Sequence, residues 1–484
     1  MTGGGRSALL YREFLSRTPF APTADQDALY RDLAAFLTGD EGDIHVINGY
    51  AGTGKTTAVA AVVASLRAYE VPCVLLAPTG RAAKVLASYT GLHAYTIHKH
   101  IYRQKSHGDD GFGQFSLSPN KAKGTLFVVD EVSLIGIGEG SDRAGSTAFG
   151  SGNLLEDLVA FVRAGVDCRL ILVGDGAQLP PIGLDCSPAL SPELMKGFGG
   201  VGFSALTEVV RQQRESGILT AATRIRELIT RPGAGEPLPL SELALPLAGD
   251  DIERISGGEL LEALSDAYGK WGEDETVVLC RSNKRTIRYN AGIRAQVLYR
   301  EEKLVRDDKL MIVKNCYQFL EGLEGIDFLA NGDIVKLERI RHYEDRYGLH
   351  FADATLRLPD YGDQEFEAKV LLDTLESESA SLTYEQSNRL YLGVDADYAH
   401  ISSKKKRYDA VREDPFYNAL QLKYAAAITG HKSQGGQWKC VFIDNPFWQD
   451  ELVEDDLKWL YTAVTRGVEK VYLINFKDSL FQTV

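Results

Sequence analysis

A glycine-rich segment that ends in lysine and threonine carries the clearest chemical signature in this chain. Residues 49–56 read Gly-Tyr-Ala-Gly-Thr-Gly-Lys-Thr, which matches the pattern G-x-x-x-x-G-K-[ST] in full. Such glycines let backbone N–H groups approach a phosphate, and the N-terminus of a following helix adds partial positive charge. The segment therefore predicts a site for nucleotide phosphates, and the alternative is a glycine-rich turn with a chance lysine.

Each side chain of this loop then has an expected role. Lys55 would reach the β- and γ-phosphates, and the hydroxyl of Thr56 would bind Mg²⁺. The residues expected to contact the nucleotide are Gly49, Ala51, Gly52, Thr53, Gly54, Lys55, Thr56 and Thr57.

Two more polar segments follow apolar stretches and can complete such a site. Phe127–Val129 is followed by Asp130 and Glu131. Asp130 can bind the Mg²⁺, and Glu131 can act as the general base that polarises water. The alternative for this pair is an acidic helix cap. Further on, the amide of Gln178 follows another apolar stretch, where it either senses the γ-phosphate or belongs to a proline-rich turn.

The first half of the chain alternates short apolar stretches with amphipathic ones, as the strands and helices of a parallel α/β sheet do. The expected strands are Ile44–Asn48, Val71–Ala77, Leu126–Asp130 and Arg169–Gly174, and the expected helices are Thr56–Ala68, Arg81–Thr90 and Leu154–Ala164. The pattern returns in a second unit, with strands expected at Thr276–Arg281, Lys439–Asp444 and Lys470–Asn475. Between these strands the chain reads as short strands with polar turns, which predicts an inserted β-barrel with strands at Asp333–Ile340, Ala354–Leu358 and Glu365–Leu371.

Composition and charge narrow the class of protein. The 484 residues are 44% hydrophobic and 25% charged, which is typical of a soluble globular protein. No apolar run approaches the roughly 18 residues of a membrane span. Six cysteines without a Cys-x-x-Cys pair indicate a reducing, cytoplasmic location and disfavour a disulfide framework.

The formal charge of −14 argues against a protein that coats nucleic acid by bulk electrostatics. Locally the balance differs, because Arg281–Lys314 contains ten basic and four acidic residues. Lys404–Arg407 is a second basic cluster, which is either a solvated loop or a contact for DNA or a partner.

Nine short segments, taken in order along the chain, match one set of motifs. They are Asp25-Gln26, Gly49–Thr56, Ala77–Ala83, Thr96–Lys99, Asp130–Ser133, Gly174–Pro180, Leu206–Gln212, Thr429–Gly435 and Tyr461–Arg466. Single matches are weak, but nine in this order are specific. Together they resemble the superfamily 1B DNA helicases, in the RecD-like and Dda-like group, and the resemblance covers most of the chain.

The resemblance implies an ATP-dependent DNA helicase or translocase that moves 5′→3′ on single-stranded DNA and uses ATP and Mg²⁺. The implied fold is α/β, with two RecA-like P-loop domains, ATP in the cleft between them, and an inserted small SH3-like β-barrel. We expect the first motor domain at residues 1–210, with a hairpin insertion at about 100–124. The second motor domain is expected at residues 211–331 and 415–484, and the barrel at 332–414.

The resemblance also implies roles for single residues. Gln26 would read the adenine, and Gly435 would contact the nucleotide. Arg211 and Arg466 would be arginine fingers at the γ-phosphate, and the alternative for each is a surface arginine in an ion pair. The residues expected to contact DNA are Pro78, Thr79, His98, His431, Lys432 and Ser433, with a structural role as the alternative for the two histidines.

In the hairpin, Phe112 and Phe115 are candidate wedges between base pairs, although the glycines at 108–113 indicate flexibility. The expected partners are single-stranded DNA, forked or tailed duplex DNA and DNA-repair or replication proteins, with a monomeric chain and no membrane. Three other functions stay open: a translocase that does not unwind, a non-enzymatic subunit of a repair complex, and a nucleotide kinase or small GTPase.

Overall fold

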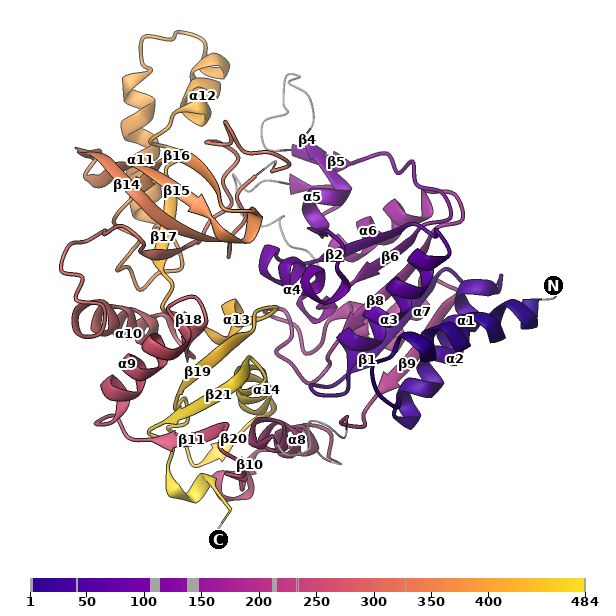
Figure 1. The fold of residues 1–484 in the computed structure, drawn as a ribbon. Helices are drawn as coiled ribbons and strands as arrows, with labels where there is room; N and C mark the ends of the chain where they lie inside the picture. Colours follow the sequence, from indigo (N-terminus) through magenta and orange to yellow (C-terminus); the bar gives the residue numbers. More distant parts are fainter. Residues whose placement is uncertain are drawn as a thin grey trace.

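The structure, a computed structural model, describes residues 3–40, 42–104, 114–136, 148–210, 216–231, 233, 235–326 and 328–482. Two units, each built on a parallel β-sheet, lie beside a closed barrel (Figure 1). This arrangement confirms the α/β fold with two RecA-like domains and an inserted small barrel. Within the described ranges we find no helical segment with the length and apolar character that crossing a bilayer requires.

The sheet of the first unit has the strand order β3-β2-β6-β8-β1-β9, with all neighbours parallel. Its strands are β1 (Ile44–Gly49), β2 (Cys73–Ala77), β3 (Ala94–Thr96), β6 (Leu126–Val129), β8 (Arg169–Gly174) and β9 (Val201–Leu206). The four expected strands are confirmed, and β3 and β9 add the two edges. These edge strands escaped the sequence pattern because β3 has three residues and β9 is only partly buried.

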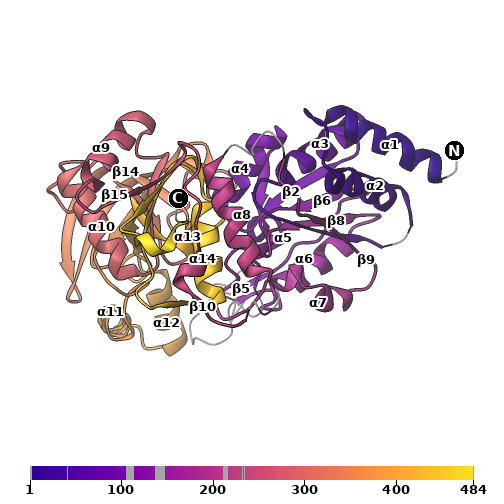
Figure 2. The same cartoon turned by 90° about the horizontal axis from the view of Figure 1, so that it is seen from below.

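Helices cover both faces of this sheet (Figure 2). One face carries α1 (Gly3–Arg17), α2 (Ala24–Thr38), α3 (Lys55–Ala68) and α4 (Gly80–Thr90); the other carries α5 (Ile97–Ile101), α6 (Leu154–Arg163) and α7 (Pro192–Lys196). The side chains of β8 alternate between the two cores, as the two-residue period of a strand requires. Ile171 and Val173 pack with the first group of helices, and Leu170 and Leu172 pack with the second.

The sheet of the second unit has the order β11-β21-β19-β12-β18. Its strands are β11 (Ile252–Ile255), β12 (Thr276–Cys280), β18 (Ala427–Thr429), β19 (Trp438–Asp444) and β21 (Gly467–Ile474). Its helices are α8 (Gly217–Ile229), α9 (Leu260–Trp271), α10 (Asn283–Gln296), α13 (Gly430–Ser433) and α14 (Glu454–Val464). A short ribbon pairs β10 (Leu238–Pro239) with β20 (Glu451–Leu452).

The barrel takes strands from a longer stretch of chain than the sequence pattern indicated. It consists of β13 (Lys309–Ile312), β14 (Ile334–Arg346), β15 (Leu349–Leu358), β16 (Gln364–Leu371) and β17 (Leu420–Tyr424). Two of these strands, β13 and β17, lie outside residues 332–414. They are short, and only their pairing with each other closes the barrel. The boundaries between the domains stay predictions.

A helical hairpin replaces the short strands expected in the last part of the barrel segment. It consists of α11 (Tyr384–Asp397) and α12 (Lys404–Glu413), which project from the barrel in Figure 1. Thr383 and Gln386 form a capping box that starts α11, and Ser403 caps α12. Lys404–Arg407 therefore lie at the start of a helix and not in a loop.

The insertion before Asp130 is a small sheet. In it β4 (Tyr102–Gln104) pairs antiparallel with β5 (Gln114–Leu117), and β7 (Ala148–Phe149) adds to β5 in parallel. Phe112, like most of the glycine-rich stretch from 136 to 152, lies outside the described residues.

A buried ion pair joins the second unit to the barrel at the start of β13. Arg294 of α10 binds Asp308, and both side chains are almost fully buried. Asp308 also accepts from Arg300 (3.2 Å) and from the backbone N–H of Val305 (2.8 Å). The carboxylate of Asp308 therefore binds two arginines and the backbone of the loop at Val305.

We expect Asp308→Asn to lower the melting temperature strongly, because it leaves the buried Arg294 without its counter-charge, at a cost of about 3–5 kcal/mol. The matched control is Asp307→Asn, which changes the same group one residue earlier, where the side chain is exposed. Equal melting temperatures for the two variants in thermal denaturation would contradict this account.

Candidate active site

The glycine-rich loop lies between β1 and α3, at the carboxyl end of the first sheet. Gly52 and Gly54 have φ angles of 73° and 78°, a region that favours glycine. A Cβ on Gly49 would lie 2.7 Å from Cγ of Lys55, so glycine at this position lets the lysine fold over the loop. Lys55 Nζ donates to the carbonyl of Tyr50 (2.9 Å), which places the ammonium group inside the curl of the loop.

Gln26 braces this loop from α2. Its side chain is fully buried, and its Nε2 donates to the carbonyl of Thr53 (3.0 Å). Its Oε1 accepts from the backbone N–H of Thr23 (3.1 Å), as part of a capping box. Both ends of the amide are thus bound to the protein, and contact with an adenine requires exchange of one of these bonds.

Two carboxylates lie at the end of β6. Asp130 Oδ1 accepts from the N–H of Glu131 (2.8 Å), and Glu131 has a φ of 56°, which is uncommon outside glycine. Burial and the charge of Glu131 raise the pKa of Asp130 to about 7, against the opposing charge of Lys55. This pair, with the hydroxyl of Thr56 in the first turn of α3, offers the oxygen donors that Mg²⁺ prefers. The donor set therefore fits a divalent cation.

A second polar cluster follows β8. Asp175 is buried, its Oδ1 accepts from the N–H of Ala177 (3.0 Å), and its Oδ2 lies 3.7 Å from Lys55 Nζ. The side-chain oxygen of Gln178 is buried and accepts no hydrogen bond from the part of the chain that is described. An unsatisfied buried acceptor costs free energy, and a water molecule would satisfy it.

Tyr461 of the second unit reaches into the loop of the first. It lies on α14, and its hydroxyl accepts from the N–H of Ala51 (2.8 Å). The same hydroxyl donates to Asp175 Oδ2 (2.8 Å). The two sheets therefore meet directly at the glycine-rich loop.

Arg466 brings a positive charge from the second unit to the acidic pair. Its side chain is buried, and Nη1 lies 3.9 Å from Oε1 of Glu131. The guanidinium also donates to the carbonyls of Thr462 and Gly436 and to the hydroxyl of Thr465. Arg466 is thus a fixed group at the cleft and not a surface arginine.

Arg211, the other expected finger, lies outside the described residues. A different arginine, Arg226 of α8, lies 4.8 Å from the ring centre of Tyr50 and donates to the carbonyl of Thr207 (3.1 Å). Sequence reasoning missed Arg226, because nothing in its helix distinguishes it. Asp175 and Tyr461 were also missed, although their places in two of the motifs are a signal that could have found them.

Gly435 lies at a junction between the units. Its φ is 72°, and a Cβ there would lie 2.9 Å from Cβ of Ala82 and 3.2 Å from the hydroxyl of Thr79. The structure places this glycine against α4, so that the second unit can approach the first closely. Its expected contact with nucleotide stays a prediction.

The residues expected to contact DNA fall on both units. Pro78 precedes Thr79, which caps α4 by accepting from the N–H of Ala82 (3.2 Å). Burial lowers the pKa of His98 to about 4, so this ring is neutral at physiological pH and offers a hydrogen bond without a charge. These side chains lie at the carboxyl ends of β2 and β3.

On the second unit, His431 and Lys432 are exposed on α13, and Lys432 Nζ donates to Asn331 Oδ1 (2.6 Å). Ser433 is different, because its hydroxyl is buried and donates to the carbonyl of Gly430 (2.7 Å). Direct contact between this hydroxyl and DNA requires that the turn open.

The barrel docks on the first unit near these residues. Lys84 of α4 forms an ion pair with Asp360 (3.1 Å), and Lys99 Nζ lies 3.8 Å from the ring centre of Tyr361. Both partners belong to the short 3-10 helix Pro359–Tyr361. The barrel therefore closes over the motif residues of the first unit.

The hairpin insertion also packs against the segment that connects β13 and β14 of the barrel. Phe115 of β5 is buried, with its ring centre 5.2 Å from that of Tyr317 and 6.2 Å from that of Phe328. A ring held in this way is not free to enter a duplex, so the expectation that Phe115 is a wedge is wrong for this arrangement of the molecule.

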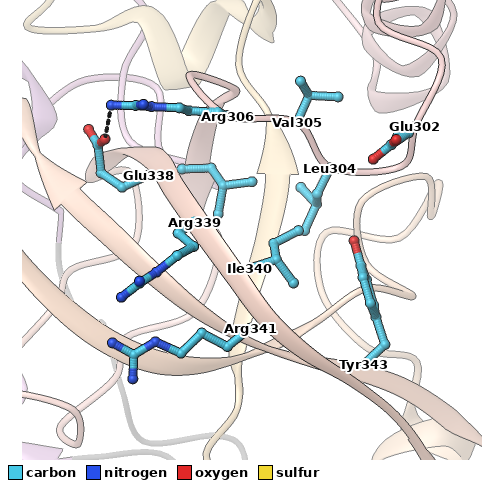
Figure 3. Close-up of a pocket in the computed structure, with 10 residues that line it drawn as sticks. Glu302, Leu304, Val305, Arg306, Glu338, Arg339, Ile340, Arg341 and Tyr343 are labelled. Atoms are coloured by element: carbon cyan, nitrogen blue, oxygen red, sulfur yellow. Dashed lines mark hydrogen bonds and ion pairs between the residues drawn. The ribbon is translucent and has the colours of Figure 1, made fainter.

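The outer surface of the barrel carries a pocket of about 340 Å³ (Figure 3). Arginines line it, but most of their charge is paired within the barrel. Of the lining arginines, Arg306 binds Glu338, which also binds Arg357 outside the pocket, and Arg341 binds Glu367. None of the predicted site residues lines this pocket.

Known proteins share this architecture in parts. A model of an AAA domain matches residues 23–144, and a model of the UvrD-like helicase C-terminal domain matches residues 424–474. The ATP-dependent RecD2 DNA helicase of Deinococcus radiodurans is 34% identical over 177 residues, 37% of this chain and 21% of that protein. The ATP-dependent DNA helicase dda of Enterobacteria phage T4 is 23% identical over 457 residues, 88% of this chain and 93% of that protein. The chain is therefore similar to DNA helicases of the RecD2 and Dda kind, to the first over a part of its length and to the second over most of it.

Solved structures that align with this chain include a Pif1 helicase from Bacteroides in complex with ADP-AlF3 and ssDNA. It aligns with a TM-score of 0.48 and 15% identity over 96% of this chain and 94% of that one. The Pif1 helicase from Candida albicans aligns with a TM-score of 0.41 and 16% identity over 96% of this chain and 97% of that one. The chain spans 21% of the length of the Deinococcus RecD2 helicase that it matches.

We expect Asp130→Asn to stabilise the metal-free protein at alkaline pH. The native pKa of about 7 exceeds the ordinary value of 3.8, so the folded state binds more protons between these values and wild-type stability falls as pH rises through them. The shift corresponds to about 4 kcal/mol at most, and relaxation of the neighbours reduces it. Thermal melts in EDTA at pH 4 and pH 8 measure the effect, and a gap between variant and wild type that does not widen with pH would contradict it.

Phe115→Ala should loosen the hairpin from the barrel, because it removes a buried ring from a three-ring contact, a change that typically costs about 3–5 kcal/mol. Hydrogen exchange should speed up in residues 114–117 and around Tyr317 and Phe328. The control is Phe203→Ala on β9, where the ring is 37% exposed. Unchanged protection of the hairpin in Phe115→Ala would show that this contact does not hold it.

Proposed function

We propose that this chain is an ATP-dependent DNA helicase that translocates on single-stranded DNA. The observation that carries the proposal is the contact between the two units, where Arg466 of one unit lies 3.9 Å from Glu131 of the other. Because the candidate base and the candidate finger come from different units, hydrolysis depends on how the units are placed. Such dependence lets a motor link each turnover to a domain movement.

The first unit binds the nucleotide in this proposal. The N–H groups of the glycine-rich loop and the ammonium of Lys55 hold the β- and γ-phosphates. Thr56 and Asp130 would hold Mg²⁺, which supplies positive charge at the phosphate oxygens when it is bound. The loop glycines keep this surface free of side chains, so that the backbone itself contacts the phosphates.

The chemical step uses groups from both units. Glu131 takes a proton from the attacking water. The side-chain oxygen of Gln178, which accepts no hydrogen bond from the described residues, accepts one from that water and orients it. Arg466 stabilises the charge that develops on the transferred phosphoryl group. Arginines in this role are worth on the order of 10³–10⁵ in rate.

The strand would be gripped by both units in turn. Thr79 and His98 offer a hydroxyl and a neutral ring from the first unit, and His431 and Lys432 lie exposed on the second. Contacts with little charge suit a strand that must be released at each step. The close approach of Gly435 to α4 places these two sets of residues on either side of a junction that domain movement would open and close.

Several finer features belong to the proposal and rest on the resemblance to the RecD-like and Dda-like group. They are movement in the 5′→3′ direction, Mg²⁺ as the metal, a monomeric chain, forked or tailed duplex DNA as substrate, and work beside DNA-repair or replication proteins. ATP hydrolysis with single-stranded DNA, and unwinding of 5′-tailed against 3′-tailed duplexes, test the first and fourth of these directly.

A translocase that does not unwind is the second candidate. The buried position of Phe115 favours it, because a ring packed against Tyr317 and Phe328 cannot separate bases. DNA-stimulated ATP hydrolysis without unwinding of a forked duplex would select this candidate over the helicase.

Arg466→Ala should keep nucleotide binding and lose about 10³-fold or more of the DNA-stimulated ATP turnover, because the phosphates are bound by the first unit and the finger comes from the second. Arg466→Lys is the matched control, because it keeps a positive charge at this buried position but lacks the planar guanidinium group with its several N–H donors. Binding of a fluorescent ATP analogue and steady-state turnover are the measurements. Wild-type turnover in Arg466→Ala would refute the role.

A further inference from the structure

Tyr461 connects the second unit to the groups that phosphate would engage. Its ring is almost completely buried, and its hydroxyl makes two hydrogen bonds of 2.8 Å, from the N–H of Ala51 and to Oδ2 of Asp175. Burial and the charge of Asp175 raise the pKa of this hydroxyl far above its ordinary value, so it keeps its proton and can donate.

The partners of Tyr461 are themselves parts of the phosphate site. Ala51 lies in the glycine-rich loop, whose N–H groups hold phosphate oxygens in proteins with this motif. Asp175 Oδ2 lies 3.7 Å from Lys55 Nζ, the other phosphate-binding group. The hydroxyl oxygen of Tyr461 thus accepts a hydrogen bond from an N–H group of the loop, as a bound phosphate oxygen would do.

Other contacts hold the second unit against the first without touching the loop. Thr462, the next residue, accepts from the N–H of Leu179 (2.8 Å), and Gln434 Nε2 donates to the carbonyl of Leu179 (2.5 Å). Loss of the Tyr461 hydroxyl therefore leaves the two units joined and removes only the connection to the phosphate site.

We propose that Tyr461 is a positioning residue that reports occupancy of the phosphate site to the second unit. This inference rests on the proposed function. The hydroxyl binds Ala51 in this structure and so competes with a phosphate oxygen for the same N–H. When phosphate takes the N–H of Ala51 and draws Lys55 away from Asp175, the hydroxyl is released. The helix that carries Tyr461 ends two residues before Arg466, so the release changes how Arg466 and the rest of the second unit are placed against the first.

The isosteric variant Tyr461→Phe tests this role, because it removes one hydroxyl and keeps the ring. The readout is the ratio of single-stranded DNA affinities with and without a non-hydrolysable ATP analogue, measured by fluorescence anisotropy. This ratio is the coupling between the two ligands. We expect Tyr461→Phe to move the ratio about 2- to 10-fold towards one, the range that corresponds to one hydrogen bond.

Thr462→Val is the matched control, since it removes the neighbouring contact between the units and leaves the loop untouched. It should keep the wild-type ratio. A wild-type ratio in Tyr461→Phe, or an equal change in both variants, would overturn the inference. A purely structural role would lower the melting temperature of Tyr461→Phe without selectively changing the ratio.

A second readout separates this inference from the proposed function. Hydrogen exchange along α14, measured without DNA, should change when the ATP analogue binds to wild type and change much less in Tyr461→Phe. Wild type that binds no DNA would overturn the proposed function, while the exchange comparison still decides the role of Tyr461. Identical exchange responses in the two proteins would refute it.

Discussion

The chemistry of this molecule depends on charged groups that are partly or fully shielded from water where the two units meet. Lys55, Asp130, Glu131 and Asp175 come from the first unit, and Arg466 comes from the second. In such surroundings charges interact more strongly than in water, and an unpaired charge is costly. Each unit therefore completes the charge balance of the other. A bound nucleotide and its metal add charge where the two units meet. We therefore expect the two units to move relative to one another when they bind.

The barrel makes the two units part of one mechanical system. It is joined to the second unit through Arg294 and Asp308, and to the first through Lys84 and Asp360 and through the ring of Tyr361. Movement between the sheets must therefore be taken up by these contacts. The helical hairpin α11–α12 projects from the barrel in Figure 1, and α12 begins with the basic residues Lys404–Arg407.

The net negative charge of the chain agrees with a motor that contacts few DNA phosphates at a time. The proposed strand contacts include a neutral His98, a hydroxyl at Thr79 and a Lys432 that is already bonded to Asn331. The arginines on the barrel surface are mostly neutralised by Glu338 and Glu367. Positive charge is therefore paired locally, and the negative excess of −14 stays compatible with DNA as a substrate.

The sequence alone determined those elements and motifs whose conformation depends only on residues that are near one another in the chain. The glycine pattern at 49–56 predicted a phosphate loop because its backbone geometry depends on glycine at given positions, and buried strands such as β8 were visible as apolar runs. Tertiary structure alone decided which distant groups meet. Tyr461 at the N–H of Ala51, Arg466 beside Glu131, Phe115 between barrel aromatics, and β13 paired with β17 are contacts across more than a hundred residues. No periodicity encodes such contacts, because they depend on how separately folded units pack against one another.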